Sequence, residues 1–163
     1  MRQAQPSFSV ARRRLLAAAV LGGFAHHAFG QNALPTAIDL QEQLAAALRQ
    51  GLPLLVMVSL PGCPFCKVAR ENYLLPMLRE RAFAAVQVDM QSATVLADFD
   101  GAQTTHAQKI RSWGVQVAPS LLFFGRGGVE VAQRLTGGTQ SDFYGAYLDQ
   151  RLGDARKAVS RAV

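Results

Sequence analysis

Cys63 and Cys66, separated by two residues, are the only cysteines in the chain. They follow the apolar run Leu54 to Leu60, a pattern typical of a strand that is covered on both faces. Cys63 would then lie at the N-terminal end of the next helix, where unpaired backbone N–H groups stabilise a thiolate. Cys66, one turn later, would point back toward Cys63. The spacing therefore predicts a redox dithiol, in which Cys63 attacks a disulfide and Cys66 resolves the mixed disulfide.

Two other interpretations of the cysteine pair have less support. A structural disulfide would close a ring of about four residues and contribute roughly 2 kcal/mol, against about 4–5 kcal/mol for a ring of about a hundred. A structural zinc site normally takes four Cys or His ligands. Beyond residue 30 the chain offers three such residues, Cys63, Cys66 and His106. We therefore expect no metal site and no cofactor, and we expect His106 to be a solvated surface residue.

The net charge of +6 comes mostly from the N-terminus. Residues 1–30 contain four arginines and no acidic residue, whereas residues 31–163 contain 13 basic and 11 acidic side chains. A nearly neutral body is not typical of a protein that binds the phosphates of nucleic acids. The length of 163 residues, half of them apolar, predicts one domain with its own hydrophobic core.

Residues 1–30 have the pattern of an export signal. Three arginines at 12–14 precede the apolar run Leu15 to Ala25, and the small residues Ala28 and Gly30 follow. That run is about 11 residues long, against the ~20 that span a bilayer. The arginines and the following leucines also resemble a twin-arginine signal, and an ordinary secretory signal is the open alternative. We expect export to the periplasm and a mature chain that starts near residue 31.

The mature chain alternates between helical and strand patterns. We expect Asp39 and Thr105 to cap helices and Pro76 to kink one. The expected helices span 40–50, 64–81, 105–113 and 139–152, and the expected strands span 54–60, 84–90, 120–124 and 129–135. Residues 91–104 read as a long loop and residues 153–163 as a charged, frayed tail. The order predicts an α/β domain over residues 31–152, with a central mixed β-sheet of about four strands flanked by helices.

Residues 54–67, LLVMVSLPGCPFCK, resemble the active-site strand and helix of the thioredoxin superfamily. The resemblance continues in the right order over residues 38–152. Further matches are Pro76, at the family's kink proline, Trp113-Gly114-Val115, Val117-Ala118-Pro119-Ser120, at the family's cis-proline loop, and the hairpin from Gly127 to Gly138. Within the superfamily, the chain looks most like exported thioredoxins of the SoxW type.

The resemblance implies a thioredoxin fold and a thiol–disulfide oxidoreductase. It implies a cis bond before Pro119, which would place the backbone of Ala118 beside the cysteines to pair with an extended substrate. Pro64 and Phe65, between the cysteines, complete the expected substrate-binding residues. Trp113 could equally form an apolar rim for substrate or pack in the core.

The sequence departs from cytoplasmic thioredoxins at two positions. Gly62 stands where they carry a Trp, and Met57 stands where they carry a buried Asp. The second departure leaves the expected site without that family's acidic residue behind the cysteines.

Together these features predict a periplasmic reductant of protein disulfides. The expected partners are protein disulfide or dithiol substrates and a membrane electron donor, with no nucleic acid, and a monomer is the default. Two alternatives remain open. One is a binding module that carries copper or presents a partner without turnover. The other is a dedicated subunit that serves one partner in sulfur oxidation or cytochrome c maturation.

Overall fold

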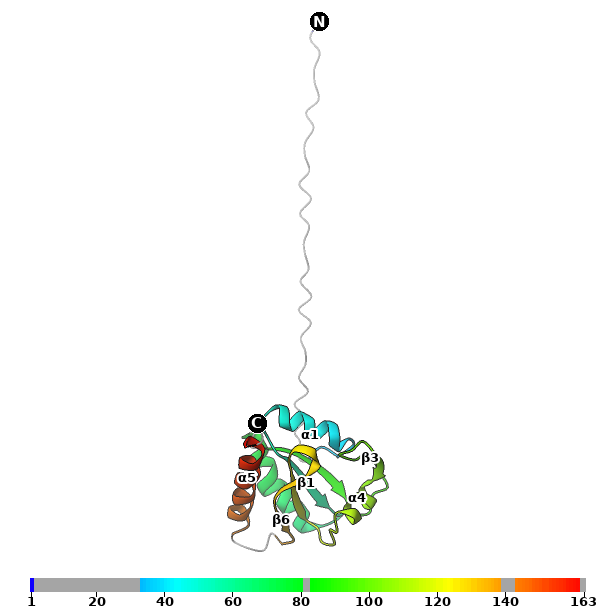
Figure 1. Ribbon diagram of the computed structural model, residues 1–163, viewed down its shortest axis with the longest axis vertical. Coiled ribbons are helices and arrows are strands. Elements are labelled where there is room, and N and C mark those ends of the chain that lie inside the picture. The colour runs from blue at the N-terminus through cyan, green and yellow to red at the C-terminus, as the bar shows by residue number, and fades with distance from the viewer. Residues whose placement is uncertain (2–32, 81–82, 139–142, 162–163) are drawn as a thin grey trace.

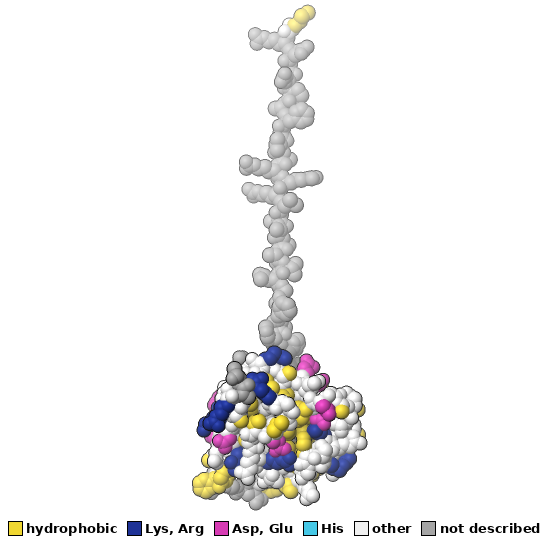
Figure 2. Space-filling view, viewed as in Figure 1, with side chains coloured by type: hydrophobic (Ala, Val, Ile, Leu, Met, Phe, Trp, Pro, Cys, Tyr) yellow, Lys and Arg dark blue, Asp and Glu magenta, His cyan; other side chains and the backbone are white. Residues whose placement is uncertain are grey.

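The computed structural model describes residues 1, 33–80, 83–138 and 143–161. The predicted export signal beyond Met1, and Thr139 as the expected cap of the last helix, lie outside these residues. Among the described residues, no helix combines the length and the apolar character that a membrane crossing requires. Figure 2 shows basic and acidic side chains interspersed over the visible face of the domain, as expected from the near balance of charge in residues 31–163.

A mixed four-stranded sheet in the order β2-β1-β5-β6 forms the centre of the domain (Figure 1). Strand β1 pairs parallel with β2 and antiparallel with β5, and β5 pairs antiparallel with β6. The strands are β1 Leu54–Ser59, β2 Ala84–Asp89, β5 Ser120–Phe124 and β6 Glu130–Thr136. Every residue of the central strands β1 and β5 is buried, as the continuous apolar run of β1 predicts. The predicted fold class is confirmed.

Helices cover both faces of this sheet. They are α1 Leu40–Arg49, α2 Pro64–Val68, α3 Leu75–Arg79, α4 His106–Ser112 and α5 Tyr144–Ser160, with a π-helical segment η1 Ala69–Leu74 and a 3-10 turn η2 Arg126–Gly128. Alternate residues of β1 pack in opposite directions. Leu55 and Met57 pack in the cluster that includes α2, α3 and α5, whereas Val56 and Val58 pack with α1 and α4.

Two predicted helix caps are confirmed. Asp39 Oδ1 accepts a hydrogen bond from the Glu42 N–H at 2.7 Å, at the start of α1. Thr105 Oγ1 accepts from the Gln108 N–H at 3.3 Å, at the start of α4. Each cap satisfies a backbone donor that the first helical turn leaves unpaired.

The predicted kink at Pro76 takes the form of a widened turn. The helical run from Pro64 to Arg79 contains η1 immediately before α3, in which Pro76 is an early residue. Proline lacks an N–H and its ring crowds the carbonyl four residues earlier. A π-helical turn at this point accommodates both effects.

Two expectations about elements are wrong. Residues 91–104 contain two short antiparallel strands, β3 Val95–Ala97 and β4 Gln103–Thr105. Leu96 is fully buried and anchors this hairpin in the core. The polar residues around it made the segment resemble a loop in the sequence. The last helix, α5, does not end near Leu152 but continues through Ser160, because Ala155 and Val159 extend its buried stripe.

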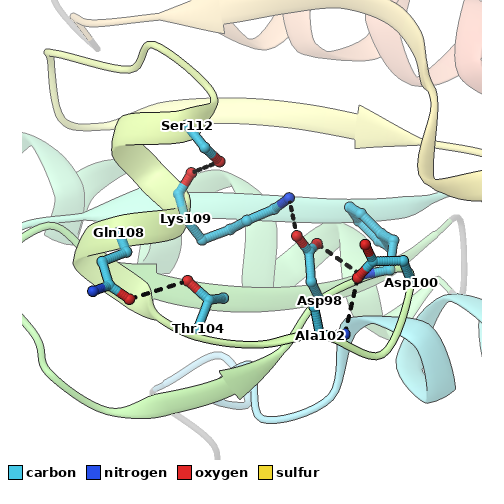
Figure 3. A network of polar contacts seen from close by, with 8 residues as sticks. Asp98, Asp100, Ala102, Thr104, Gln108, Lys109 and Ser112 are labelled. Carbon is cyan, nitrogen blue, oxygen red and sulfur yellow. Dashed lines mark hydrogen bonds and ion pairs between the residues drawn. The ribbon is translucent and has the colours of Figure 1, made fainter.

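Polar contacts tie the β3–β4 hairpin to α4, as Figure 3 shows. Lys109 Nζ forms an ion pair with Asp98 and lies 5.2 Å from the centre of the Trp113 ring. Asp100 Oδ1 accepts from the Ala102 N–H at 2.9 Å and holds the turn of the hairpin. Thr104 Oγ1 donates to Gln108 at 3.3 Å.

His106 is not the surface residue that was expected, because its side chain is 0% exposed. Its Nδ1 accepts a hydrogen bond from the Asp89 N–H at 3.2 Å, so the other ring nitrogen carries the proton. Nε2 therefore donates to the Ala37 carbonyl, 2.7 Å away. The imidazole joins the end of β2, the segment before α1 and the start of α4.

Replacing His106 with leucine should destabilise the fold. The substitution leaves the Asp89 N–H and the Ala37 carbonyl buried without partners, which costs about 2–4 kcal/mol of unfolding free energy in total. Urea unfolding of His106→Leu at neutral pH measures the loss. Arg111→Leu, at an exposed position of the same helix, is the control. A loss no larger than that of the control would contradict the bridging role.

The buried side chain of Tyr144 should make the free energy of unfolding fall at alkaline pH. Its side chain is 2% exposed, and its hydroxyl has no hydrogen-bond partner among the described residues. Burial, with a smaller contribution from nearby Tyr73, raises the pKa of Tyr144 above its usual value. A raised folded pKa means that stability present below pH ~10 is lost as the pH rises beyond it.

Tyr144→Phe removes both the unpaired hydroxyl and its titration. We expect an unfolding free energy at pH 7 that is unchanged or up to about 1 kcal/mol higher, because no hydrogen bond is lost. We also expect a shallower loss of stability above pH ~10. The measurement is denaturant unfolding across that range, with exposed Tyr147→Phe as the control. An alkaline loss equal to that of the parent protein would refute the assignment.

Candidate active site

Cys63 and Cys66 are joined by a disulfide at the junction between β1 and α2. Gly62, at φ +73°, allows the turn that follows the strand. Cys63 is the N-cap of α2, and its Sγ accepts a hydrogen bond from the Cys66 N–H at 3.1 Å. Pro64 takes the first helical position, where no N–H is needed. The sulfur of Cys63 therefore occupies the place of a capping oxygen at the start of a helix.

The two sulfur-bearing residues differ in their surroundings. Cys63 is half-buried, whereas Cys66 is 1% exposed and belongs to the apolar cluster beneath α2. Met57 is fully buried in the same cluster, and its only polar atom is the thioether sulfur, a weak acceptor. An apolar environment disfavours a charged thiolate, and Cys66 is the residue it surrounds.

A second loop lies against Cys63. The Ala118–Pro119 peptide bond is cis, and the Ala118 carbonyl oxygen lies 4.0 Å from Cys63 Sγ. Two hydrogen bonds fix this loop: Ser120 Oγ donates to the Val117 carbonyl at 2.7 Å, and the Gly137 N–H donates to the Pro119 carbonyl at 2.8 Å.

The residues predicted for the site therefore meet around one disulfide. Pro64 and Phe65 lie between the cysteines and are exposed, Phe65 by 40%. Ala118 approaches Cys63 from the loop before β5, although 55 residues separate the two in the sequence, and Pro119 follows Ala118 across the cis bond. This approach depends on the antiparallel pairing of β1 and β5.

Trp113 does not join this group. Its ring lies 5.4 Å from the ring of Phe124 and 6.5 Å from that of Phe99, in the cluster on the α1 side of the sheet. Its carbonyl accepts a hydrogen bond from Arg134 at 2.6 Å. The core-packing interpretation of Trp113 is the one that these contacts support.

Sequence reasoning missed a cleft of about 540 Å³ beside the disulfide. A chain of hydrogen bonds crosses its lining: Arg70 Nη1 donates to Gln87 Oε1 at 3.0 Å, and Gln87 Nε2 donates to Asp89 Oδ1 at 3.1 Å. The lining residues are Ser59, Leu60, Pro61, Gly62, Cys63, Pro64, Cys66, Lys67, Arg70, Gln87 and Asp89. The spacing of Lys67 and Arg70 behind the cysteines was the available signal, since it puts all four on one helical face.

No metal-binding cluster is present within residues 33–80, 83–138 and 143–161, where no three His, Cys, Asp or Glu side chains are grouped to hold an ion. Both ring nitrogens of His106 are hydrogen-bonded to the backbone, so neither has a lone pair directed at a metal ion.

The sequence matches a family model described as a thioredoxin-like domain over residues 40–152. The chain belongs to the thioredoxin-like family. No curated protein sequence matches it. This thioredoxin-like domain carries a C-x-x-C disulfide, and the family and the motif together support thiol–disulfide oxidoreductase chemistry in general.

Solved structures resemble this thioredoxin-like chain over most of its length. A DsbH oxidoreductase superposes with a TM-score of 0.52 at 16% identity, covering 77% of this chain and 86% of the other. A thioredoxin from Thermus thermophilus gives 0.48 at 22% identity, covering 74% and 86%. The periplasmic thioredoxin SoxS from Paracoccus pantotrophus, in reduced form, gives 0.42 at 22% identity, covering 63% and 98%. At these identities the likeness concerns the fold alone.

Proposed function

We propose that this protein is an exported thiol–disulfide oxidoreductase that reduces protein disulfides. The observation that carries the proposal is the asymmetry of the two cysteines. Cys63 is half-buried at the helix N-terminus beside the Ala118 carbonyl, whereas Cys66 is buried behind it. An attacking thiol needs access and a stabilised thiolate, and a resolving thiol needs neither.

The reduced protein starts the reaction. The Cys63 thiolate attacks one sulfur of the substrate disulfide, forms a mixed disulfide and releases the first substrate thiolate. The Cys66 thiol then loses its proton and attacks Cys63 Sγ. This step releases the second substrate thiolate and leaves Cys63 and Cys66 oxidised, so two electrons pass to the substrate. A membrane donor returns the protein to its dithiol form.

Substrate binding involves the surface around Cys63. An extended substrate segment pairs with the backbone at Ala118, next to Pro119, while Pro64 and exposed Phe65 offer apolar contact. The N-terminal pattern of arginines and an apolar run supports export, and hence a periplasmic location. The resemblance to SoxW-type thioredoxins rests separately on the residues around Cys63 and Cys66.

Replacing Cys66 with serine should trap substrates. Without the resolving thiol, mixed disulfides on Cys63 persist until an external thiol attacks them. Catalytic reduction of insulin by a small dithiol donor should be lost, and non-reducing gels should show adducts with exported proteins. The control is Cys63→Ser, which should trap nothing. Equal trapping by both variants would refute the assigned roles, and absence of insulin turnover by the parent protein would favour a binding module.

The identity of the intervening residues predicts a moderate redox potential. Pro64 and Phe65 are uncharged, so the residues between the cysteines add no charge that stabilises the Cys63 thiolate, and we expect a disulfide that is not strongly oxidising. We expect a potential more negative than about −120 mV, the value of an extreme oxidant. Equilibration against a glutathione series measures it, and Phe65→His should shift it upward. A parent potential near −120 mV would indicate an oxidase rather than a reductant.

A further inference from the structure

Two cationic side chains line the cleft beside the disulfide without a carboxylate partner. Lys67 and Arg70 share this cleft with Cys63 and Cys66, and all four follow one helical face. Within the described part of the chain, neither Lys67 nor Arg70 takes part in an ion pair. Their charge therefore acts on whatever enters the cleft.

The opposite wall only partly offsets this charge. Asp89 is the single carboxylate among the lining residues, so the cleft has two cations and one acid. The neutral Gln87 amide stands between Asp89 and Arg70, accepting from the guanidinium and donating to the carboxylate. The ammonium group of exposed Lys67 has no hydrogen-bond partner among the described residues.

We propose that this cleft selects disulfides that carry a carboxylate close to the reacting sulfur. Lys67 and Arg70 attract the carboxylate while Cys63 reacts with the sulfur. The inference rests on the proposed function, because it names the substrate class of the same site. Along the helix, Lys67 is four residues from Cys63, a rise of about 6 Å, and Arg70 is seven residues from it, a rise of about 10.5 Å. A unit charge at about 6 Å across water changes a rate roughly threefold.

The test measures how fast the reduced full-length protein reacts with three small disulfides. These are dithiodiglycolate, which is anionic, hydroxyethyl disulfide, which is neutral, and cystamine, which is cationic. Lys67→Gln and Arg70→Gln are compared with Arg79→Gln, which removes the same charge from an exposed position outside the cleft. Ratios between disulfides cancel any general change in the reactivity of Cys63.

We expect Lys67→Gln to lower the anionic-to-neutral rate ratio about threefold and Arg70→Gln, which is farther from Cys63, to lower it about twofold. Both should raise the cationic-to-neutral ratio. Molar salt should reduce the selectivity of the parent protein, because these charges are accessible to solvent. Arg79→Gln should leave both ratios unchanged. Two disulfide-linked peptides that differ only by Glu or Lys beside the cysteine show whether protein segments are selected in the same way as small acids.

Rate ratios that stay the same in the parent and both cleft variants would overturn this inference alone. The same holds if the two variants slow all three disulfides equally. A protein that reduces none of the disulfides would overturn both this inference and the proposed function.

Discussion

Burial of β1 on both faces is the constraint on which the rest of the domain depends. A strand whose side chains are apolar in both directions needs a layer of helices on each side. Its alternate residues do enter two separate clusters, one beneath α2 and α5 and one beneath α1 and α4. Strand β1 lies between β2 and β5 in the sheet, so the chain leaves the sheet at the end of a central strand and not of an edge strand. The disulfide lies at that exit.

The site combines two environments across a few ångströms. Behind the disulfide are Met57 and the other apolar side chains that bury Cys66. In front are a helix N-terminus, the Ala118 carbonyl and a cleft with basic side chains. The first environment disfavours a thiolate, whereas the helix N-terminus and the basic side chains of the second favour one. The roles proposed for the two cysteines rest on this difference in their surroundings.

Polar side chains hold the sheet edge beside the site. His106 fixes the backbone at Asp89, the last residue of β2, while the side chain of Asp89 faces the cleft through its bond to Gln87. The segment 35–37 also pairs with β2, where the Gln87 N–H donates to the Pro35 carbonyl at 2.8 Å. These contacts cover an edge strand and orient one wall of the cleft at the same time.

The sequence by itself determined the features whose interactions are local. Cys63 and Cys66 lie within one helical turn, and the caps Asp39 and Thr105 bond residues three positions away, so short-range spacing predicted them. The run of β1 likewise predicted a strand covered on both faces, because burial on both faces requires continuous apolar composition.

Only the tertiary structure decided what depends on distant contacts. His106 is buried because Ala37, 69 residues earlier, and Asp89, 17 residues earlier, supply its partners. The β3–β4 hairpin depends on one buried leucine, and the end of α5 depends on small residues that pack against the core. The cleft wall joins Arg70 to Gln87 across two elements. A sequence pattern reflects the preferences of neighbouring residues, whereas these features depend on contacts between residues that are far apart in the sequence and that only folding brings together.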